Sequence, residues 1–339
     1  LDARSPTTWR PSDHSPGRPA RSAAVRCTRA APAGAGHPVD GFIRARLGRE
    51  GKKPSALADR RTLIRRLSFD LTGLPPSPAE VDAFLADKDP AAYDRLVEKL
   101  LASEHYGERM AVYWLDLVRY ADTNGIHGDN HREHALFRDY VIDAFNENMA
   151  FDRFTREQLA GDLLPRPSLQ QRVATGFVRM NPTTAEGGAI PLEFQAKNNF
   201  DRTETLGTVL LGMTLTCARC HTHKYDPIPQ TEYYQLLAFF NSTAERSMDG
   251  NSYTYAPVIK APANQQAWIT WNKLNADGEK LLSGLKKEDS AALEARDANK
   301  WKNGSLRDRL LLLASAGAAP ADYTKHTKNN IPQNEETLP

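Results

Sequence analysis

Two of the three cysteines in this chain lie close together, in the string "TCARCHTHKYDPIPQ" that begins at residue 216. Cys217 and Cys220 are three positions apart, and His221 follows directly. This spacing suits a c-type haem, because two cysteines on one helical turn form thioethers while the histidine behind them coordinates the iron. The motif therefore favours covalently attached haem c, with Cys217 and Cys220 as attachment sites and His221 as the proximal iron ligand.

Two other interpretations of the motif stay open. A structural zinc ion needs four ligands, and Cys217, Cys220, His221 and His223 could offer three or four of them. Adjacent ligands on so short a segment rarely close a tetrahedron, and the chain has no second CxxC. A local disulfide between Cys217 and Cys220 would leave Cys27 alone. In either case the segment would be a structural clip in a binding module, and not a redox centre.

A second polar string, "YADTNGIHGDNHREH" at residues 120–134, carries three histidines. His127, His131 and His134 would share one face if the whole string were helical, but its two glycines favour a loop in the first half. The simpler interpretation is a solvated connection that carries helix caps. In the alternative interpretation one histidine, foremost His127, is a distal iron ligand or a proton donor beside the haem.

Other side chains offer weaker candidates for metal contacts. Asp122 and Asp129 could bind calcium, but they lack the complete acidic pattern of an EF-hand loop. Met180 and Met213 are alternatives for the sixth iron position, since a methionine thioether raises the reduction potential. Most methionines belong to the core, and the apolar surroundings of Met213 in "LLGMTLTC" favour that interpretation.

Charge and hydropathy exclude several classes of partner. The 339 residues include 44 basic and 42 acidic side chains, so the net charge of +2 provides no strong field for nucleic acid or an anionic membrane. No run of 18 apolar residues occurs, so we expect no transmembrane segment. Because haem is normally attached to cysteines outside the cytoplasmic membrane, we expect an exported protein, either periplasmic or at the cell surface, although no signal peptide is visible.

The pattern of apolar residues predicts an all-α protein. Residues 1–37 are rich in Arg, Pro, Ala and Gly and are expected to be disordered. An irregular multi-helix domain should occupy 38–245, followed by a linker at 246–263, a polar helical extension at 264–315 and a tail at 316–339. Capping boxes are expected at Ser77 with Glu80 and at Thr155 with Gln158. We also expect a helix to start at Pro191 and Thr231 to be the N-cap of another. The polar helix should carry Leu281, Leu282 and Leu285.

Five strings together resemble a known family, and they are "DRRTLIRRLSFDLTGLPPSPAEVDAFLAD", "YGERMAVYWLDLVRYADTNG", "FRDYVIDAFNENMAFDRFTREQLAGDLLP", "AEGGAI" and "CARCHTHKYDPI". Residues 38–245 are similar to the planctomycete cytochrome-c-type domain of unknown function, number fifteen-forty-nine. The resemblance implies that Cys217, Cys220 and His221 attach and ligate haem. In that family the domain commonly sits in large exported proteins between a cytochrome-c-like segment and a partner domain. Neither neighbour is recognisable here, which indicates a fragment or an unusual gene model.

These observations support three hypotheses of different kinds. The first is an exported c-type haem protein that transfers one electron at a time, with a redox partner protein or a downstream domain of the same polypeptide as its partner. The second is a haem-dependent enzyme that oxidises an organic substrate such as a glycan, with His127, Asp122 or Asp129 handling protons. The third is the structural or binding module with a zinc or disulfide clip.

Overall fold

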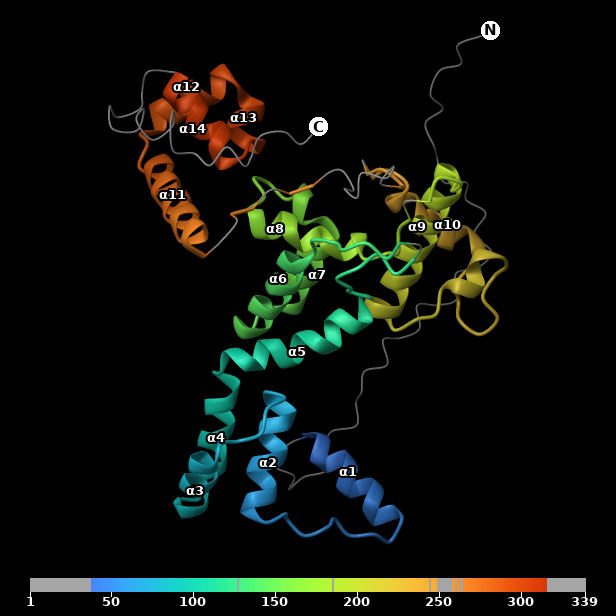
Figure 1. Cartoon of the computed structure of the whole chain (residues 1–339), viewed down its shortest axis with the longest axis vertical. Helices are drawn as coiled ribbons and strands as arrows, with labels where there is room; N and C mark the ends of the chain where they lie inside the picture. Colours follow the sequence, from blue (N-terminus) through green and yellow to red (C-terminus); the bar gives the residue numbers. More distant parts are fainter. Residues whose placement is uncertain are drawn as a thin grey trace. The chain divides into compact units, whose positions relative to one another are not determined.

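The computed structural model describes residues 38–126, 128–184, 186–243, 245–248, 258–259, 261–262 and 265–315 (Figure 1). The segment expected to be disordered at 1–37, the tail at 316–339 and most of the linker at 246–263 lie outside these residues, as do His127 and Cys27. Contacts divide the chain into two units, residues 1–59 and residues 60–339.

The described residues form helices and no β-strand, which confirms the predicted all-α class; the nearest approach to a sheet is an isolated bridge between Thr123 and His131. Fourteen α-helices and four short 3₁₀ or π segments follow one another along the described chain. They are α1 (Pro38–Arg49), α2 (Arg60–Leu71), α3 (Pro78–Ala86), α4 (Ala92–Leu101), α5 (Glu104–Leu117), α6 (Ala135–Asn146), α7 (Phe151–Ala160), η1 (Gly161–Leu163), α8 (Leu169–Ala174), η2 (Thr175–Arg179), α9 (Pro191–Leu206), η3 (Gly207–Leu211), η4 (Thr216–Arg219), α10 (Gln230–Phe240), α11 (Gln265–Ser283), α12 (Lys287–Arg296), α13 (Ala298–Asn303) and α14 (Leu306–Ser315).

The helices α2 to α4 form a small cluster of their own. Ile64 on α2 packs with Phe84 and Ala92, and the Arg60 guanidinium lies over the Phe84 ring and donates to the Phe84 carbonyl at 2.5 Å. The predicted capping box at Ser77 is confirmed: its hydroxyl accepts from the Glu80 backbone at 3.3 Å, while the Glu80 carboxylate accepts from the Ser77 backbone at 2.9 Å. The Lys99 ammonium pairs with the other oxygen of the Glu80 carboxylate at 2.9 Å, so this tertiary contact leaves the cap in place.

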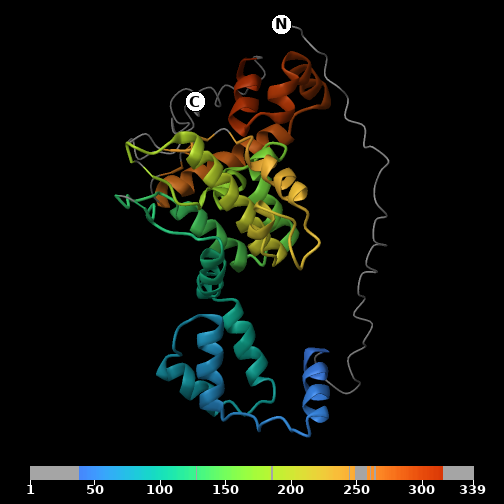
Figure 2. The ribbon, with the colours of Figure 1, turned by 90° about the vertical axis from the view of Figure 1, so that its right-hand side faces the viewer.

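The main core lies between α5, α6, α7 and α8, and Figure 2 shows α6 to α8 in green, side by side. Its centre is aromatic, with the Trp114 and Phe154 rings 4.9 Å apart. The helices α5 and α6 approach closely at Gly107, where a β-carbon would lie 2.4 Å from the Ile142 carbonyl oxygen. Glycine is therefore required at this crossing by sterics and not by backbone conformation.

Two predicted helix starts are wrong. The helix α7 begins at Phe151, so Thr155 and Gln158 lie inside it and form no capping box. Gln158 is fully buried and accepts a hydrogen bond from the Trp114 indole at 2.8 Å, a long-range contact that outweighs the local cap pattern. Likewise α10 begins at Gln230 after an N-cap at Pro229, so Thr231 does not cap it.

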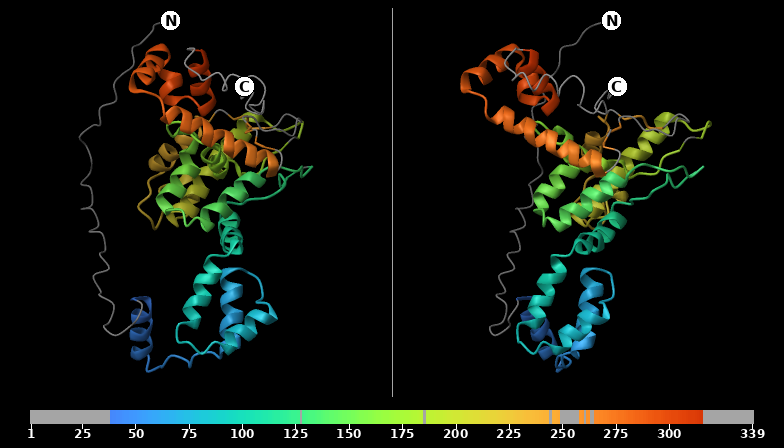
Figure 3. Two further views of the ribbon diagram at one scale, coloured as in Figure 1. Left: turned by 90° about the vertical axis from the view of Figure 1, so that its left-hand side faces the viewer. Right: turned by 60° about the vertical axis from the view of Figure 1, so that its left-hand side comes forward.

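The expected single polar helix at 264–315 is instead four helices, α11 to α14, coloured orange to red in Figure 3. Leu282, Leu293 and Leu313 lie at the centre of a separate apolar cluster that α11, α12 and α14 share. The breaks have recognisable causes: the Asp297 carboxylate caps α13, and Ser305 with Asp308 forms reciprocal caps at the start of α14. Helix α11 also contributes Trp268 and Trp271 to the edge of the main core.

Candidate functional site

The cysteine motif begins on the 3₁₀ turn η4, which contains Cys217; Cys220 is the C-cap residue of this turn and His221 follows it. The carbonyl of Cys217 accepts hydrogen bonds from the backbone of Cys220 and of His221, each at 3.3 Å. Side chains three positions apart eclipse one another on a 3₁₀ helix, so Cys217 and Cys220 project from the same side of the turn. Both thiols are free and exposed. The turn thus presents two unbonded thiols together to solvent.

The turn is anchored from behind by an apolar cluster between α9 and α10. Leu215 and Ala218, on either side of the first cysteine, are buried with Ile228 and Tyr233. The carbonyl of Arg219 accepts hydrogen bonds from the Tyr234 hydroxyl at 3.0 Å and from the Gln230 amide at 3.1 Å. The buried residues alternate with the thiols, so the turn keeps one face in the core and the other in water.

His221 adopts a defined protonation form. Its Nδ1 lies 2.8 Å from the carbonyl oxygen of Thr222, and because a carbonyl only accepts, Nδ1 must carry the proton and donate. In the neutral ring this leaves the lone pair of Nε2 free, which is the form a metal-ligating histidine takes. The expected partner of the non-ligating nitrogen, a backbone carbonyl, is therefore present.

Asp226, five residues after His221, faces His223. The Asp226 backbone donates to His223 Nδ1 at 2.8 Å, and the Tyr225 backbone approaches the same nitrogen at 3.3 Å. The Asp226 carboxylate is 3.4 Å from that nitrogen, but the shorter backbone bond decides that Nδ1 accepts. His223 also donates its own backbone N–H to the Ile228 carbonyl at 3.0 Å. His223 thus closes the loop behind the motif.

The residues at this turn fit a c-type haem. Two free thiols share one side of a rigid turn, and the next residue holds its Nε2 available, which are the donor types that thioether attachment and axial ligation need. Among the residues that the structure describes, no group of three or more His, Cys, Asp or Glu side chains is arranged to hold a metal ion. The protein donors at the turn are thus two thiols and one imidazole.

The histidine-rich string is a loop and not a helix, so the condition for three imidazoles on one face is not met. His131 lies in the isolated bridge to Thr123, His134 occupies the N-cap position of α6, and His127 lies outside the described residues. Burial, followed by the charges of two nearby arginines, lowers the pKa of His134 to about 3. His134 is therefore a neutral, half-buried structural residue at neutral pH.

The carboxylates of this loop and the two candidate methionines are also engaged elsewhere. Asp129, with a left-handed φ of 47°, accepts from the Gly125 backbone at 2.8 Å, and hydrogen bonds from Thr123 and Gly125 hold the pKa of its carboxyl below the usual range. The Tyr120 hydroxyl donates to Asp122 at 2.9 Å. Met180 is buried in the main core and Met213 packs against the cluster behind the cysteines.

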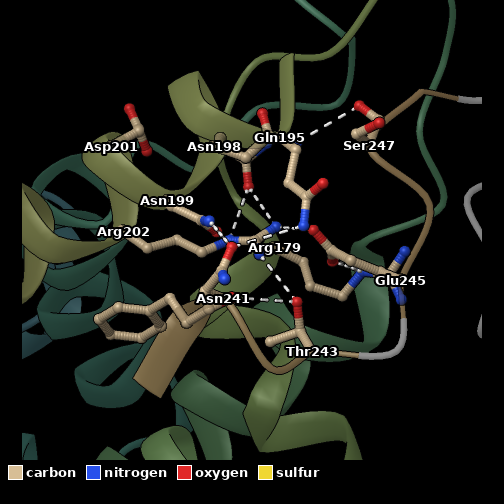
Figure 4. A network of polar contacts seen from close by, with 12 residues as sticks. Arg179, Gln195, Asn198, Asn199, Asp201, Arg202, Asn241, Thr243, Glu245 and Ser247 are labelled. Atoms are coloured by element: carbon tan, nitrogen blue, oxygen red, sulfur yellow. Dashed lines mark hydrogen bonds and ion pairs between the residues drawn. The ribbon is translucent and has the colours of Figure 1, made fainter. Parts of the chain in front are cut away.

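Sequence reasoning missed a buried polar network on the other side of α9 (Figure 4). Asn181 lies at its centre: its amide donates to Asn198 at 3.0 Å, and its side-chain oxygen accepts from Arg202 at 3.0 Å. The Arg132 guanidinium donates to the Asn181 carbonyl at 2.8 Å. Most of the buried polar residues belong to this region, and they are Asn124, Arg132, Asn181, Thr183, Thr184, Asn198, Asn199, Arg202, Thr203 and Thr205.

The network could not be read from the sequence because its members come from separate segments. They lie on the loop before α6, on the stretch after η2 and on α9, and no spacing within these segments pairs their residues with one another. The one available signal was an unusual face of α9, where Asn198, Asn199 and Arg202 recur at helical spacing in place of apolar residues.

None of the helices in the described part of the chain has the length and apolarity needed to cross a membrane. One family model, described as "PSCyt2: Protein of unknown function (DUF1549)", matches residues 38–245. Neither the curated proteins nor the solved structures contain a significant match to the chain.

Proposed function

The chain belongs to the PSCyt2 family of unknown function (DUF1549), and from this premise we propose that it is an exported c-type haem protein that transfers single electrons. One observation carries the proposal. The turn η4 presents Cys217 and Cys220 on one side, both unbonded and exposed, with His221 next in sequence and its Nδ1 hydrogen-bonded to a carbonyl. These three residues supply every protein ligand that covalent attachment and one axial position require.

Each residue has a distinct role in this proposal. The sulfurs of Cys217 and Cys220 would form the two thioethers, and Nε2 of His221 would ligate the iron. The bound haem would supply reversible one-electron chemistry at its iron. The Thr222 carbonyl would hold the imidazole ring in the ligating form, and the buried Ala218 between the cysteines would keep the turn against the core.

The exposure of the turn favours electron transfer over catalysis in a closed pocket. Beside the cysteines, the Tyr225 ring is 83% exposed, and both thiols and His221 are also exposed. A haem edge at such a surface is open to a redox partner, either a separate protein or a downstream domain of the same polypeptide. Solvent exposure is also one of the factors that set the reduction potential.

The direct test is a pyridine haemochrome spectrum of the chain produced in a host with haem-attachment machinery and exported to the periplasm. We expect the spectrum of a haem attached by two thioethers. The double variant Cys217→Ala with Cys220→Ala should lose covalent haem, whereas His221→Ala should keep some haem but change its spectrum to high spin. Cys27→Ala, the third cysteine, is the matched control and should leave the spectrum unchanged.

The same preparation separates the competing functions. Stoichiometric zinc with no iron, or a protected Cys217–Cys220 disulfide with no response to haem supply, would overturn the proposal in favour of a structural clip. A spectrum that shifts on addition of cyanide would show an open iron position, as the oxidative-enzyme hypothesis requires. Recovery of the intact native protein from the cytosol without haem would contradict both the haem and the export.

A further inference from the structure

The segment after α10 lies over the buried polar network and contacts it with every second residue. The Asn241 oxygen accepts from Asn199 at 2.8 Å, and the Ser247 carbonyl accepts from Asn198 at 3.3 Å. Between them, the Thr243 hydroxyl is 3.5 Å from Arg202, and Glu245 forms an ion pair with the same arginine. We call residues 241–243 and 245–247 the strap. It is held to the network by polar contacts and contributes no residue to the apolar core clusters.

Two arginines from different elements converge on the single carboxylate of Glu245, as Figure 4 shows. Arg202 on α9 contacts one carboxylate oxygen, and Nε of Arg179, at the end of η2, lies 3.5 Å from the other. Charge-assisted hydrogen bonds from guanidinium groups are among the strong contacts that carboxylates make in proteins. The arrangement is therefore that of a carboxylate-binding site whose occupant belongs to the chain itself.

The side chains of the site differ in how exposed they are to solvent. The Arg202 side chain is 3% exposed and is fixed from below by two hydrogen bonds to the Asn181 oxygen. The side chains of Glu245 and Arg179 are 12% and 22% exposed, so the carboxylate enters from the solvent side. The pre-positioned group is thus the arginine, whereas the carboxylate arrives on a segment without regular secondary structure.

The electrostatics around the site support an anion-binding role. Burial lowers the pKa of the Arg179 guanidinium, the Glu245 carboxylate raises it, and the charge of Arg202 lowers it again. The pKa of His134 is lowered as well, first by burial and then by the positive charges of Arg132 and Arg179. Ion pairs at such depth stabilise a fold less than well-packed apolar residues would, so a buried charge cluster calls for another explanation.

We propose that Arg202, Arg179 and the surrounding amides form a binding site for a small carboxylate-bearing ligand, and that Glu245 occupies this site until the ligand displaces it. The Glu245 carboxylate is a built-in mimic of the ligand's anionic group. Displacement removes the ion pairs of Glu245 with Arg202 and Arg179 and leaves the strap held by the neutral contacts of Asn241, Thr243 and Ser247, so it should loosen the strap. The site is separate from the cysteine turn, so the proposal does not depend on haem.

The first test replaces the built-in carboxylate in the full chain with Glu245→Ala and asks whether free acetate restores stability. We expect a lower melting temperature, which 100 mM acetate raises by at least about 2 °C more than sodium chloride of equal ionic strength. The matched control is Glu193→Ala, which removes a carboxylate from an exposed ion pair with Lys197. Acetate should change the melting temperature of Glu193→Ala no more than it changes that of the wild type.

The second test uses the wild-type chain, so it decides the question even if Glu245→Ala fails to fold. Arg246 is exposed, but its neighbours Glu245 and Ser247 are bonded to the network, so we expect trypsin to cut after Arg246 faster once the strap loosens, and succinate should accelerate this cut relative to sodium chloride. Cleavage after Lys286, between α11 and α12, is the internal control and should not change. If succinate leaves the Arg246 cut unchanged, or if acetate rescues Glu245→Ala no better than chloride, the proposal is overturned.

Discussion

The half-buried histidine at the start of α6 makes the stability of the protein depend on pH. The pKa of His134 falls from 6.5 to about 3 in the folded chain, first because burial disfavours the charged ring and then because Arg132 and Arg179 repel it. Between these two values the unfolded chain binds a proton that the folded chain does not. Stability is therefore complete above pH 6.5 and is lost as the pH falls from 6.5 towards 3.

The expected size of the effect follows from this difference. Each pH unit in that window costs about 1.4 kcal/mol, so lowering the pH from 8 to 5 should remove about 2 kcal/mol of unfolding free energy through His134 alone. Urea unfolding of the wild type and of His134→Gln at both pH values isolates this contribution. His131→Gln, an exposed histidine in the same loop, is the matched control. If wild type and His134→Gln lose the same free energy to within about 0.5 kcal/mol, the assigned burial of His134 is wrong.

Three further predictions concern the framework. Gly107→Ala should cost about 1–3 kcal/mol, because its β-carbon meets the Ile142 carbonyl, whereas Gly187→Ala, with nothing within 4 Å, should be near neutral; equal urea midpoints would contradict the close crossing. Ser77→Ala should lose about 1 kcal/mol through the capping box of α3, and an unchanged melting temperature would show that the cap contributes nothing. Gln158→Leu should cost about 1–3 kcal/mol by leaving the buried Trp114 N–H without its acceptor, and a neutral result in urea would contradict that bond.

Local signals in the sequence predicted structure where distant contacts left the capping atoms free, as at Glu80, whose second carboxylate oxygen pairs with Lys99. Ser77 and Glu80 cap α3 as expected, and Pro191 starts α9, because these residues act on their own backbone. The related pattern Thr-x-x-Gln at Thr155 forms no capping box, since the Gln158 side chain is bonded to Trp114, more than forty positions away. In the C-terminal region the sequence predicts one polar helix, whereas caps at Asp297 and Ser305 begin separate helices there.

The two candidate sites differ in how far the sequence reveals them. The cysteine turn is contiguous and made of rare residue types, so its position and spacing were evident, and the structure added the partner of His221 Nδ1 and the role of His223. The carboxylate site is assembled from α9, the end of η2 and the strap, all of common residue types. The site forms only when these distant segments come together in the fold, so no short stretch of the sequence predicts it.

The contacts of the strap bear on where this domain ends. The family match stops at residue 245, yet the Ser247 carbonyl is bonded to Asn198 and two tryptophans of α11 cover the edge of the main core. A shortened chain ending at the family boundary would leave an amide of α9 without its acceptor and strip indole rings from apolar surface. A recombinant chain should therefore extend at least to Trp271, and we expect truncation at 245 to expose apolar surface and favour aggregation.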